Sequence, residues 1–432
     1  MRIPLLVLGA AVTAATTTLS AQDTLSPQSV TLVQVLDSVA ARYPALGAAR
    51  ARVRAARGSR STAGTLGNPI LMYDVENAPL PGRAPPPMDR EVMFTAMLPL
   101  EPLYQRWSRV NGANAEIRAA EADTQAERQR IGIDATRAFY RMARAQVALE
   151  AARDLKTWLD SVVAYNRARV KEGVAAEADL IRSELERDRA DVEATMQEAD
   201  FARARADLTV FLNAQPDAQF LVAARDAPFA LPDVSPTART GSARPDIRAA
   251  RDRVAAAGSG VTTERTSLIR QLGITVGTKR SAGTTSLMAG ISMPFPLFDQ
   301  NRGAIARAAA ERDAAGFDLA AQERIGRAEI VGSAEAARLL TERAGVLADA
   351  SRGQGYLARA DEARRIALGA YREGAVPLIQ VIDAARAWGE ARVAFYQILY
   401  AQHESVVGLL VAEGVDISSA LPSLALAAGV RP

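Results

Sequence analysis

The sequence has no cysteine, a single histidine and few aromatic side chains. Without cysteine the chain forms no disulfide and no thiolate metal site, and it has no N-terminal Cys that could be lipidated. The lone His403 also excludes a His-based metal centre within one chain. Aromatic residues are 5% of a chain that is 49% apolar, so alanine supplies much of the apolar fraction. This composition favours long helices with small-residue seams over a bulky globular core.

A long hydrophobic run is also lacking. The chain begins MRIPLLVLGAAVTAATTTLSAQ, with one arginine, a short apolar run, and small residues at Ser20 and Ala21. This pattern is typical of a secretory signal peptide, residues 1–21. A membrane anchor would need about 20 apolar residues, and the run breaks into threonines sooner. We therefore expect an exported protein that starts near Gln22.

Charge of one sign is not concentrated anywhere in the chain. Lys plus Arg number 52 against 49 acidic residues, and the signs alternate closely, as in RARVKEG and ERDRADVEA. Such alternation indicates solvated helix faces rather than a basic stripe for nucleic acid. The sequence has no Ser/His/Asp set, phosphate loop or paired carboxylates with a shaped pocket. We therefore predict that the protein is not an enzyme and uses no cofactor.

The second half of the chain repeats the first. ARYPALGAARARVRAARG, which contains Pro44, corresponds to SARPDIRAARDRVAAAGSG, which contains Pro245. RVKEGVAAEADLI, with Gly173, corresponds to AYREGAVPLIQVI, with Gly374, and the offset is 201 in both comparisons (245 − 44 and 374 − 173). A constant offset over such distances indicates a tandem duplication.

Each copy has a helix, two β-like segments and then very long helices. The first helices are predicted near 31–60 and 243–268. SLMAGISM alternates with period two, so we expect four strands in two hairpins, at about 66–78, 91–100, 270–280 and 286–295. Prolines end the second strand of each hairpin abruptly, because proline costs about 3 kcal/mol in a helix interior. Asp299 and Asn301 are expected to cap the helix that follows.

The long helices carry heptad seams and turn at a glycine. Residues spaced 3 and 4 apart form one seam: Ala135, Ala138, Met142, Ala145, Leu149 and Ala152. The helical hairpins are predicted over about 103–213 and 297–413. Gly173 and Gly374 suit the left-handed position that ends a helix. Trp388 and Phe395 are expected to pack in a second seam, and His403 to be structural.

Strands of about ten residues in an exported protein match tilted outer-membrane strands. A bilayer tolerates strands only in closed barrels, and known single-chain barrels have at least about eight strands. Four strands cannot close, so several chains must share one barrel. The helical hairpins would then continue this wall as a periplasmic tube.

In these features the sequence resembles the TolC-like outer-membrane efflux proteins. The resemblance runs from TLVQVLDSVAARYPALGAARARVRAARG to VVGLLVAEGVD and is most specific in ISMPFPLFDQNRGAIARAAAERDAA and the two segments around Gly173 and Gly374. It implies a mainly α fold with a small β part: a homotrimer with a 12-stranded β-barrel and a 12-helix periplasmic α-barrel. It also implies a passive outer-membrane exit duct that docks on a periplasmic adaptor and an inner-membrane pump.

NPILMYDVENAP and PFPLFDQNRGAI are most similar to the branch that serves heavy-metal exporters of the resistance-nodulation-division type. Members of that branch often have a lipidated N-terminal Cys, which this chain lacks. Heavy-metal cations are therefore one expected cargo, and drugs or other small molecules the other. The resemblance also divides the chain into a first repeat (22–213), an equatorial linker (214–243), a second repeat (244–414) and a C-terminal tail (415–432).

The same resemblance implies roles for individual residues. Asp383 corresponds to an acidic position facing the pore at its narrow end, and Gln380 stands one turn earlier, where some relatives carry a second acid. Three copies of Asp383 would make a carboxylate ring that favours cations. Asp179 and Arg372 are expected as a pair that holds this aperture shut, although a solvated helix start explains Asp179 equally well. The docking tips for the adaptor are implied at Gly173, Val174, Gly374 and Ala375.

Two other functions fit parts of the sequence. A periplasmic adaptor also uses long helical hairpins, but it would normally have one hairpin flanked by small β-domains. A soluble coiled-coil scaffold would explain the heptads but neither the prolines nor the alternating strands. The repeat at an offset of 201 residues favours the duct over the adaptor.

Overall fold

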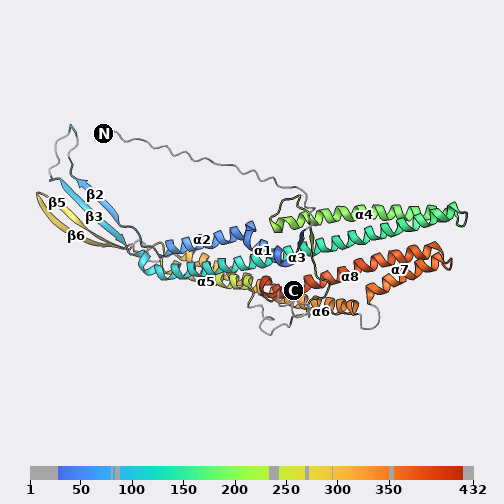
Figure 1. Cartoon of the computed structure of the whole chain (residues 1–432). Coiled ribbons are helices and arrows are strands. Elements are labelled where there is room, and N and C mark those ends of the chain that lie inside the picture. The colour runs from blue at the N-terminus through green and yellow to red at the C-terminus, as the bar shows by residue number, and fades with distance from the viewer. Residues whose placement is uncertain are drawn as a thin grey trace, which may run out of the picture.

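The computed structural model describes residues 28–78, 81–82, 88–232, 243–267, 272–293, 295–349 and 355–421. The predicted signal peptide and the last part of the C-terminal tail lie outside these residues. The described chain is mainly helical with a small amount of sheet, as the sequence predicts. Figure 1 shows an elongated molecule with a four-stranded sheet at one end and two helical hairpins at the other.

The two copies have the same order of elements. The first contains α1 (Leu32–Arg42), α2 (Pro44–Gly64), β2 (Ile70–Glu76), β3 (Glu91–Pro99), α3 (Glu101–Lys171) and α4 (Glu177–Leu212). The second contains α5 (Pro245–Thr266), β5 (Gly273–Ser281), β6 (Thr284–Ser292), α6 (Arg302–Ala348), α7 (Tyr356–Arg372) and α8 (Leu378–Ala412). Two short strands, β1 (Gln28–Val30) and β4 (Phe220–Val222), pair in parallel. This pairing places the segment before α1 beside the linker.

The duplication is visible in the helix ends. An offset of 201 residues takes the ends of α3, Glu101 and Lys171, to Arg302 and Arg372, where α6 starts and α7 ends. It also relates the left-handed residues after α4 and α8, Asn213 (φ 52°) and Gly414 (φ 85°). The repeat seen in the sequence therefore extends to the boundaries of the long helices.

The long helix predicted after the second hairpin is two helices. α6 ends at Ala348, Asp349 is extended with ψ 111°, and α7 starts after the extended Gly355. The sequence over this break, DASRGQG, has two glycines, whereas the matching segment of α3, ALEAARD, is rich in alanine. Each glycine disfavours a helix by about 1 kcal/mol relative to alanine, which explains why only the first copy continues.

The helix predicted near 31–60 is also divided. α1 ends at Arg42, and Tyr43 adopts an extended conformation (φ −67°, ψ 124°) before Pro44 opens α2. A residue that precedes proline is driven out of the helical region by the proline ring, so Pro44 separates the two helices.

The four main strands form one antiparallel sheet in the order β2-β3-β5-β6. A tight turn at Ala282 and Gly283, both with positive φ (51° and 77°), joins β5 to β6, as two-residue hairpin turns require. Gly277 pairs with Thr95, and a Cβ at Gly277 would lie 2.7 Å from the Thr95 Cα. Only glycine allows β3 and β5 to approach this closely.

The sheet has two chemically different faces. The register places apolar side chains on one face, which is largely exposed: Leu71, Tyr73, Phe94, Leu98, Val276, Leu287 and Ile291. The other face carries Asp74, Glu76, Glu91, Lys279 and several Thr and Ser residues. In the described part of the chain no helix covers either face (Figure 1).

The helices lie side by side along the length of the molecule. α3 packs against α2 and α4 on one side and against α5 and α8 on the other, while α6 packs against α5 and α8. The end of α8 meets the start of α5, because Gly414 lies directly against the backbone of Ala243. Among the described helices, none is long and apolar enough to cross a membrane.

The hydrophobic core lies midway along the helices. It joins α1, the middle of α3, the ends of α4 and α8, and the linker around β4. Ala135 and Met142 of the predicted seam are fully buried here, and Phe395 is buried beside them. Residues 417–421 also contribute, through Ile417 and Leu421. This core fixes the long helices at their midpoint and leaves both ends to project.

Asn301 opens α6, but not in the way the sequence suggests. Its backbone is left-handed (φ 56°), and no side-chain bond caps the helix. The Asn301 amide nitrogen instead donates to the backbone oxygen and the carboxylate of Glu264 on α5, at 2.7 and 3.0 Å. Asp299 accepts the Asn301 backbone N–H at 2.9 Å. The capping prediction for these two side chains was therefore wrong, since they fasten the turn before α6 to α5.

Candidate functional site

The two hairpin tips have the same turn. In the first, Gly173 has φ 73° and the Val174 N–H donates to the carbonyl of Arg169 at 2.9 Å. In the second, Gly374 has φ 76° and the Ala375 N–H donates to the carbonyl of Ala370 at 2.8 Å. The predicted left-handed glycines are thus confirmed, and each closes its helix by the Schellman pattern.

Both tips are open to the outside of the chain. Nothing lies within 4 Å of a Cβ built on Gly173 or Gly374, and Val174 is 60% exposed. Ala375 is also exposed. An exposed apolar residue next to an exposed glycine, repeated at two matched positions, makes a small surface on which another helix could pack closely.

Just behind the tips, a small apolar cluster joins the two hairpins. It is built around Val162 of α3, Tyr371 of α7, and Leu378, Val381 and Ile382 of α8. Trp158 and Tyr165 of α3 pack against it. The cluster lies apart from the main core, so the far ends of the hairpins have a contact of their own.

A buried hydrogen bond completes this junction. The Tyr371 hydroxyl donates to Asn166 Oδ1 at 2.6 Å, and Asn166 is fully buried. The Arg169 guanidinium lies over the rings of Tyr165 and Tyr371, 5.5 and 5.8 Å from their centroids. Burial raises the pKa of Tyr371, and the negative charge of Asp179 raises it further, so the hydroxyl stays a donor. The Asn166 Nδ2 has no hydrogen-bond partner in the described structure.

Ion pairs link the hairpins further from the tips. Arg386 of α8 pairs with Glu186 of α4, which also accepts from Arg189 at 2.9 Å. Nearer the core, Arg392 of α8 pairs with Asp154 and Glu150 of α3 at 2.6 and 3.2 Å. A cavity of about 490 Å³, with an apolar floor from α3, lies between α4 and α8 beside the Arg386–Glu186 pair.

The four aperture residues lie close to the tips and are accessible. Asp383 and Gln380 are both exposed on the first turns of α8, and Asp383 forms no ion pair with another described residue. Arg372 is exposed at the end of α7, and Asp179 is half-buried at the start of α4. Within the described chain no ion pair joins Asp179 to Arg372; the charge of Asp179 acts on Tyr371 instead.

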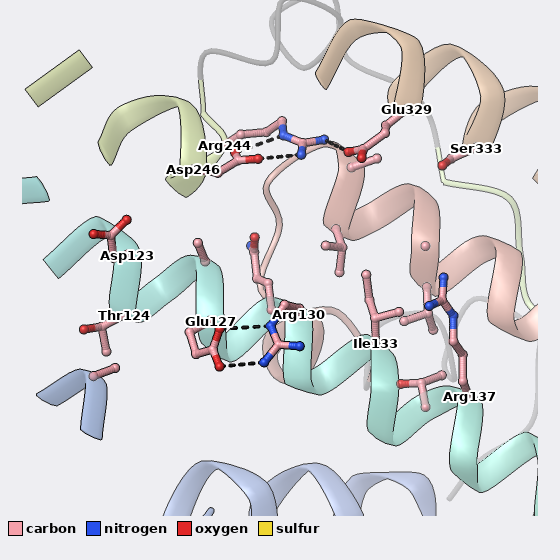
Figure 2. A pocket seen from close by; sticks show the side chains of 18 of the residues that line it. Asp123, Thr124, Glu127, Arg130, Ile133, Arg137, Arg244, Asp246, Glu329 and Ser333 are labelled. Atoms are coloured by element: carbon pink, nitrogen blue, oxygen red, sulfur yellow. Dashed lines mark hydrogen bonds and ion pairs between the residues drawn. The ribbon is translucent and has the colours of Figure 1, made fainter. Parts of the chain in front are cut away.

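The middle of the molecule has a larger cavity, of about 760 Å³, lined by α2, α3, α5, α6 and α8. On one side of the cavity, Figure 2 shows Arg244 bonded to both Asp246 and Glu329. On the other side it shows Glu127 bonded to Arg130. The Arg244–Asp246 distance is 2.7 Å and the Arg244–Glu329 distance 2.6 Å. Burial raises the pKa of Asp246, but its hydrogen bonds with Arg244 and the positive charge of that residue bring it below the ordinary value.

This cavity borders the packed core, with which it shares Val407. Along α3, Glu127, Arg130 and Arg137 line the cavity, whereas Ala135 and Phe139 point into the core around α1. At 100° per residue these two groups lie on roughly opposite sides of the helix. At this level one side of α3 therefore carries charged side chains, and the other packs against α1 in the core.

The linker is fixed to α8 by two buried polar side chains. Gln402 accepts from the Phe229 N–H at 3.0 Å and donates to its carbonyl at 2.8 Å. His403 bonds the Ala227 carbonyl at 2.9 Å, and burial lowers the pKa of this histidine to about 4. His403 is thus neutral and donates from Nε2. The expectation that it is structural agrees with this setting.

Side chains that usually bind metals do not gather in the part of the chain that the structure describes. That part contains no group of three or more His, Cys, Asp or Glu side chains that could hold a metal ion. The charged residues in the two cavities are mostly satisfied by one another.

The sequence did not identify the residues of the tip junction. Asn166 and Arg169 follow Val162 at spacings of 4 and 3, so continuing the predicted seam would have found them. A polar residue at a seam position is a signal in itself, because it needs a partner when buried. Its partner Tyr371, however, is 205 residues away, and only the fold brings the two together.

Comparison with known proteins finds a family match in the second repeat. Residues 239–415 match the family model described as outer membrane efflux protein. No curated protein sequence matches the chain.

Solved structures share the fold over most of the chain. The outer-membrane channel OprN is 21% identical, with a TM-score of 0.72 over 90% of both chains. CusC is 15% identical, with a TM-score of 0.73 over 89% of this chain and 92% of that one. The Campylobacter jejuni CmeC outer membrane channel is 15% identical, with a TM-score of 0.73 over 96% and 97%.

The structural similarity agrees with the mainly helical fold expected from the sequence. It also covers the first repeat, which lies outside the family match. Residues 239–415 are therefore similar to the outer membrane efflux proteins, and the chain as a whole shares the fold of solved outer-membrane channels.

Proposed function

We propose that this protein is the exit duct of a tripartite efflux system, working as a homotrimer with a periplasmic adaptor and an inner-membrane pump. The observation that carries the proposal is the four-stranded sheet. One of its faces is apolar and exposed, and its two edge strands, β2 and β6, have no further partner in the described chain. Three copies would supply twelve strands, enough to close a barrel with its apolar face towards lipid.

The helices would continue this barrel as a tunnel. Each chain would supply four helical columns: α3, α6 with α7, α2 followed along the long axis by α4, and α5 followed by α8 (Figure 1). Three chains would then make twelve columns around one channel. The charged face that holds the 760 Å³ cavity would line the water-filled interior.

The exposed tips support docking of the adaptor. Gly173 with Val174, and Gly374 with Ala375, present the same backbone turn at two places on each chain. A trimer would display six such tips in a ring. A helical hairpin of the adaptor could approach closely there, because glycine and alanine leave room for another backbone.

The narrow end of the duct lies near the same tips. Three copies of Asp383 would form a carboxylate ring, with Gln380 adding polar but uncharged groups one turn away. Asp179 and Arg372 remain our proposal for a lock between neighbouring hairpins, since Arg372 is exposed and unpaired within one described chain. A ring of this sign favours cations as cargo, and the heavy-metal branch is our preferred assignment over a duct for drugs.

The first test is the mass and conductance of the protein extracted from the outer membrane in detergent. We expect a trimer that forms a single cation-preferring pore in a planar bilayer. A monomer that stays in solution without detergent would contradict the shared barrel, and with it the whole proposal.

Docking is tested separately at Gly374. Gly374→Trp should leave the trimer intact but abolish export, because the indole would block the approach of the adaptor. Gly374→Asn is the control, since asparagine tolerates a left-handed backbone and adds little bulk. Normal export by the tryptophan variant would remove the tip from the docking surface.

A further inference from the structure

Large apolar side chains are exposed where the sheet meets the long helices (Figure 1). In the first copy Leu103 and Trp107 follow β3, and Trp107 is 72% exposed. In the second copy Phe295, Leu297 and Phe298 follow β6, and Phe298 is 95% exposed. These five residues form the junction patch. Large apolar side chains that are exposed together in one region indicate an interaction surface, whereas a lone exposed leucine does not.

The two halves of the junction patch lie at the same level of the molecule. On α5, Thr263 donates to the Ser108 hydroxyl of α3 at 2.9 Å, and the next residue, Glu264, accepts from Asn301 just before α6. Trp107 and Asn301 are therefore held at one height on the two helices that flank α5. Because Phe295, Leu297 and Phe298 lie between β6 and Asn301, the patch is a band across the molecule.

The sheet ends directly before this band. Pro99, Gly273 and Ser292 stand side by side in the final rows of β3, β5 and β6. Phe295 is three residues beyond Ser292, and Trp107 is eight residues beyond Pro99. The junction patch therefore borders the end of the sheet from which the helices continue.

Trp107 lies on the side of α3 that its neighbours leave uncovered. Gln105 donates to Ser267 beside α5 at 3.1 Å, and Arg106 donates to the carbonyl of Gly64 at the end of α2 at 3.0 Å. At 100° per residue, Trp107 is about 160° from Gln105 and about 100° from Arg106 around the helix. Leu103, one turn earlier, shares this free side.

The height of the sheet matches the apolar layer of an outer membrane. β3, β5 and β6 each have nine residues. At about 3.4 Å per residue and a tilt of about 40°, such strands span about 23 Å, close to the apolar band of about 25 Å on outer-membrane barrels. Aromatic residues flank that band at both of its borders, and tryptophan suits the headgroup level because it joins an apolar ring to a polar N–H.

Two arginines accompany the junction patch. Arg106 directly precedes Trp107, and Arg302 directly follows Asn301. Both are exposed, and neither forms an ion pair with another described residue. A guanidinium group binds phosphate through paired charge-assisted hydrogen bonds, so these two side chains complement an anionic headgroup.

We propose that the junction patch and the two arginines bind phospholipid in the leaflet that faces the periplasm. Trp107, Phe295 and Phe298 lie at the boundary between headgroups and acyl chains, and Arg106 and Arg302 bind the phosphates. The contact fixes the depth of the barrel at the point where each strand becomes a helix. This inference rests on the proposed duct, because only a closed barrel brings the patch to a membrane.

A neighbouring copy of the chain is the alternative cover for the second half of the patch. In a closed barrel, β6 would pair with β2 of the next copy, which would bring the segment TLGNPI, residues 65–70, beside the end of β6. This segment has no acidic side chain that could pair with Arg302. The charge of Arg302 therefore favours phospholipid over a second copy.

The test uses tryptophan fluorescence, because the chain has only three tryptophans. The full-length variant Trp158→Phe with Trp388→Phe leaves Trp107 as the reporter and is reconstituted in phospholipid vesicles. Lipid that carries bromine on the acyl chain near the headgroup should quench Trp107 about twofold, and lipid brominated near the chain end should quench it less. The control, Trp107→Phe with Trp158→Phe, leaves Trp388 on α8 under the Arg364 guanidinium and should be quenched by neither lipid.

Absence of quenching of Trp107 by both lipids would overturn the inference. Iodide then identifies the real surroundings, since a ring that iodide quenches lies in water and a ring shielded from iodide is covered by protein. Trp158 packs in the tip junction, so its replacement could prevent assembly. In that case Trp107→Phe in the otherwise unchanged chain should remove the part of the emission that the brominated lipid quenches, and an unchanged quenched part would contradict the proposal.

The arginines are tested by the lipid that the purified trimer retains. Native mass spectrometry of Arg106→Gln with Arg302→Gln should show about half as much bound phosphatidylglycerol as the wild type, or less. Arg182→Gln, on an exposed arginine of α4 far from the sheet, is the matched control and should retain as much as the wild type. Equal retention by the double variant would refute the phosphate contact.

Conductance of the same vesicles separates this inference from the duct itself. A conducting trimer whose Trp107 is not quenched would count against the lipid contact alone. Vesicles without pores would count against the duct.

Discussion

At the scale of single residues, the tip junction depends on one buried hydrogen bond. Asn166 accepts from the Tyr371 hydroxyl, and both residues are buried between α3 and α7. Removing the hydroxyl would leave the Asn166 carbonyl without a partner, in addition to its unpartnered Nδ2. A buried polar group left without its partner costs about 1–3 kcal/mol.

Tyr371→Phe should therefore loosen the hairpin ends and raise hydrogen exchange in α7 while the midpoint core stays protected. The double variant Asn166→Leu with Tyr371→Phe should recover most of the loss, because both polar groups are then replaced by apolar ones. If the double variant is no more stable than the single one, the hydrogen bond is not what holds the junction.

The sheet depends in the same way on a single glycine. A Cβ at Gly277 would lie 2.7 Å from the Thr95 Cα and Cγ2, which the backbone cannot relieve without moving β3 from β5. Gly277→Ala should strongly reduce the yield of assembled protein in the outer membrane. Gly290→Ala is the control on the neighbouring strand, since nothing lies within 4 Å of its Cβ position. Equal yields of the two variants would show that the strands tolerate the close contact.

At the scale of elements, hydrogen bonds from Gln402 and His403 of α8 hold the linker. We expect the stabilisation that His403 contributes to fall in acid. The pKa of His403 is lowered to about 4 by burial, against an ordinary value of 6.5. Between these two pH values, His403 is therefore protonated in the unfolded chain but neutral in the folded chain. The stabilisation is complete above pH 6.5 and is lost as pH falls towards 4, by about 3 kcal/mol if the full shift applies.

The groups that face His403 should modify this effect only slightly. Arg225 opposes protonation further through its positive charge, and the rings of Phe229, Tyr140 and Tyr400 surround the imidazole. The measurement is the free energy of unfolding from pH 7 to 4 for the wild type and for His403→Gln. The variant can still donate to Ala227 but cannot titrate, so it should lose the extra slope; matching slopes would assign the acid sensitivity elsewhere.

Much of the element order was predictable because it depends on local signals. The offset of 201 residues, the prolines before the long helices and the glycines at the tips are all visible in the sequence. The break between α6 and α7 was missed, although its two glycines are equally local, because the symmetry with α3 argued for a continuous helix. The β1–β4 pair and the Asn166–Tyr371 hydrogen bond join segments that are far apart in the chain. Periodic patterns report only local structure, so they cannot predict such contacts.

At the scale of the whole molecule, a single chain leaves strand edges unpaired and apolar helix surfaces exposed in the part that the structure describes. The sheet ends in free strands, α4 exposes Ile181, Val192 and Met196, and α6 exposes Val331, Leu339 and Val346. Apolar side chains on two opposite helix edges suit contact between copies that are related by rotation, as a closed ring requires. Removing these surfaces from water would therefore favour association of several copies over isolated chains.

The proposed trimer allows a separate test of the aperture residues. In a trimer, Asp383→Asn removes three negative charges from the narrow end and should weaken the block of conductance by divalent cations. Gln380→Glu adds three charges one turn away and should strengthen it, so the two variants form an opposed pair with little change in side-chain size. Both can be measured as single-channel conductance against the concentration of the divalent ion. Two variants that shift the block in the same direction, or not at all, would mean that these residues do not line the narrowest part of the pore.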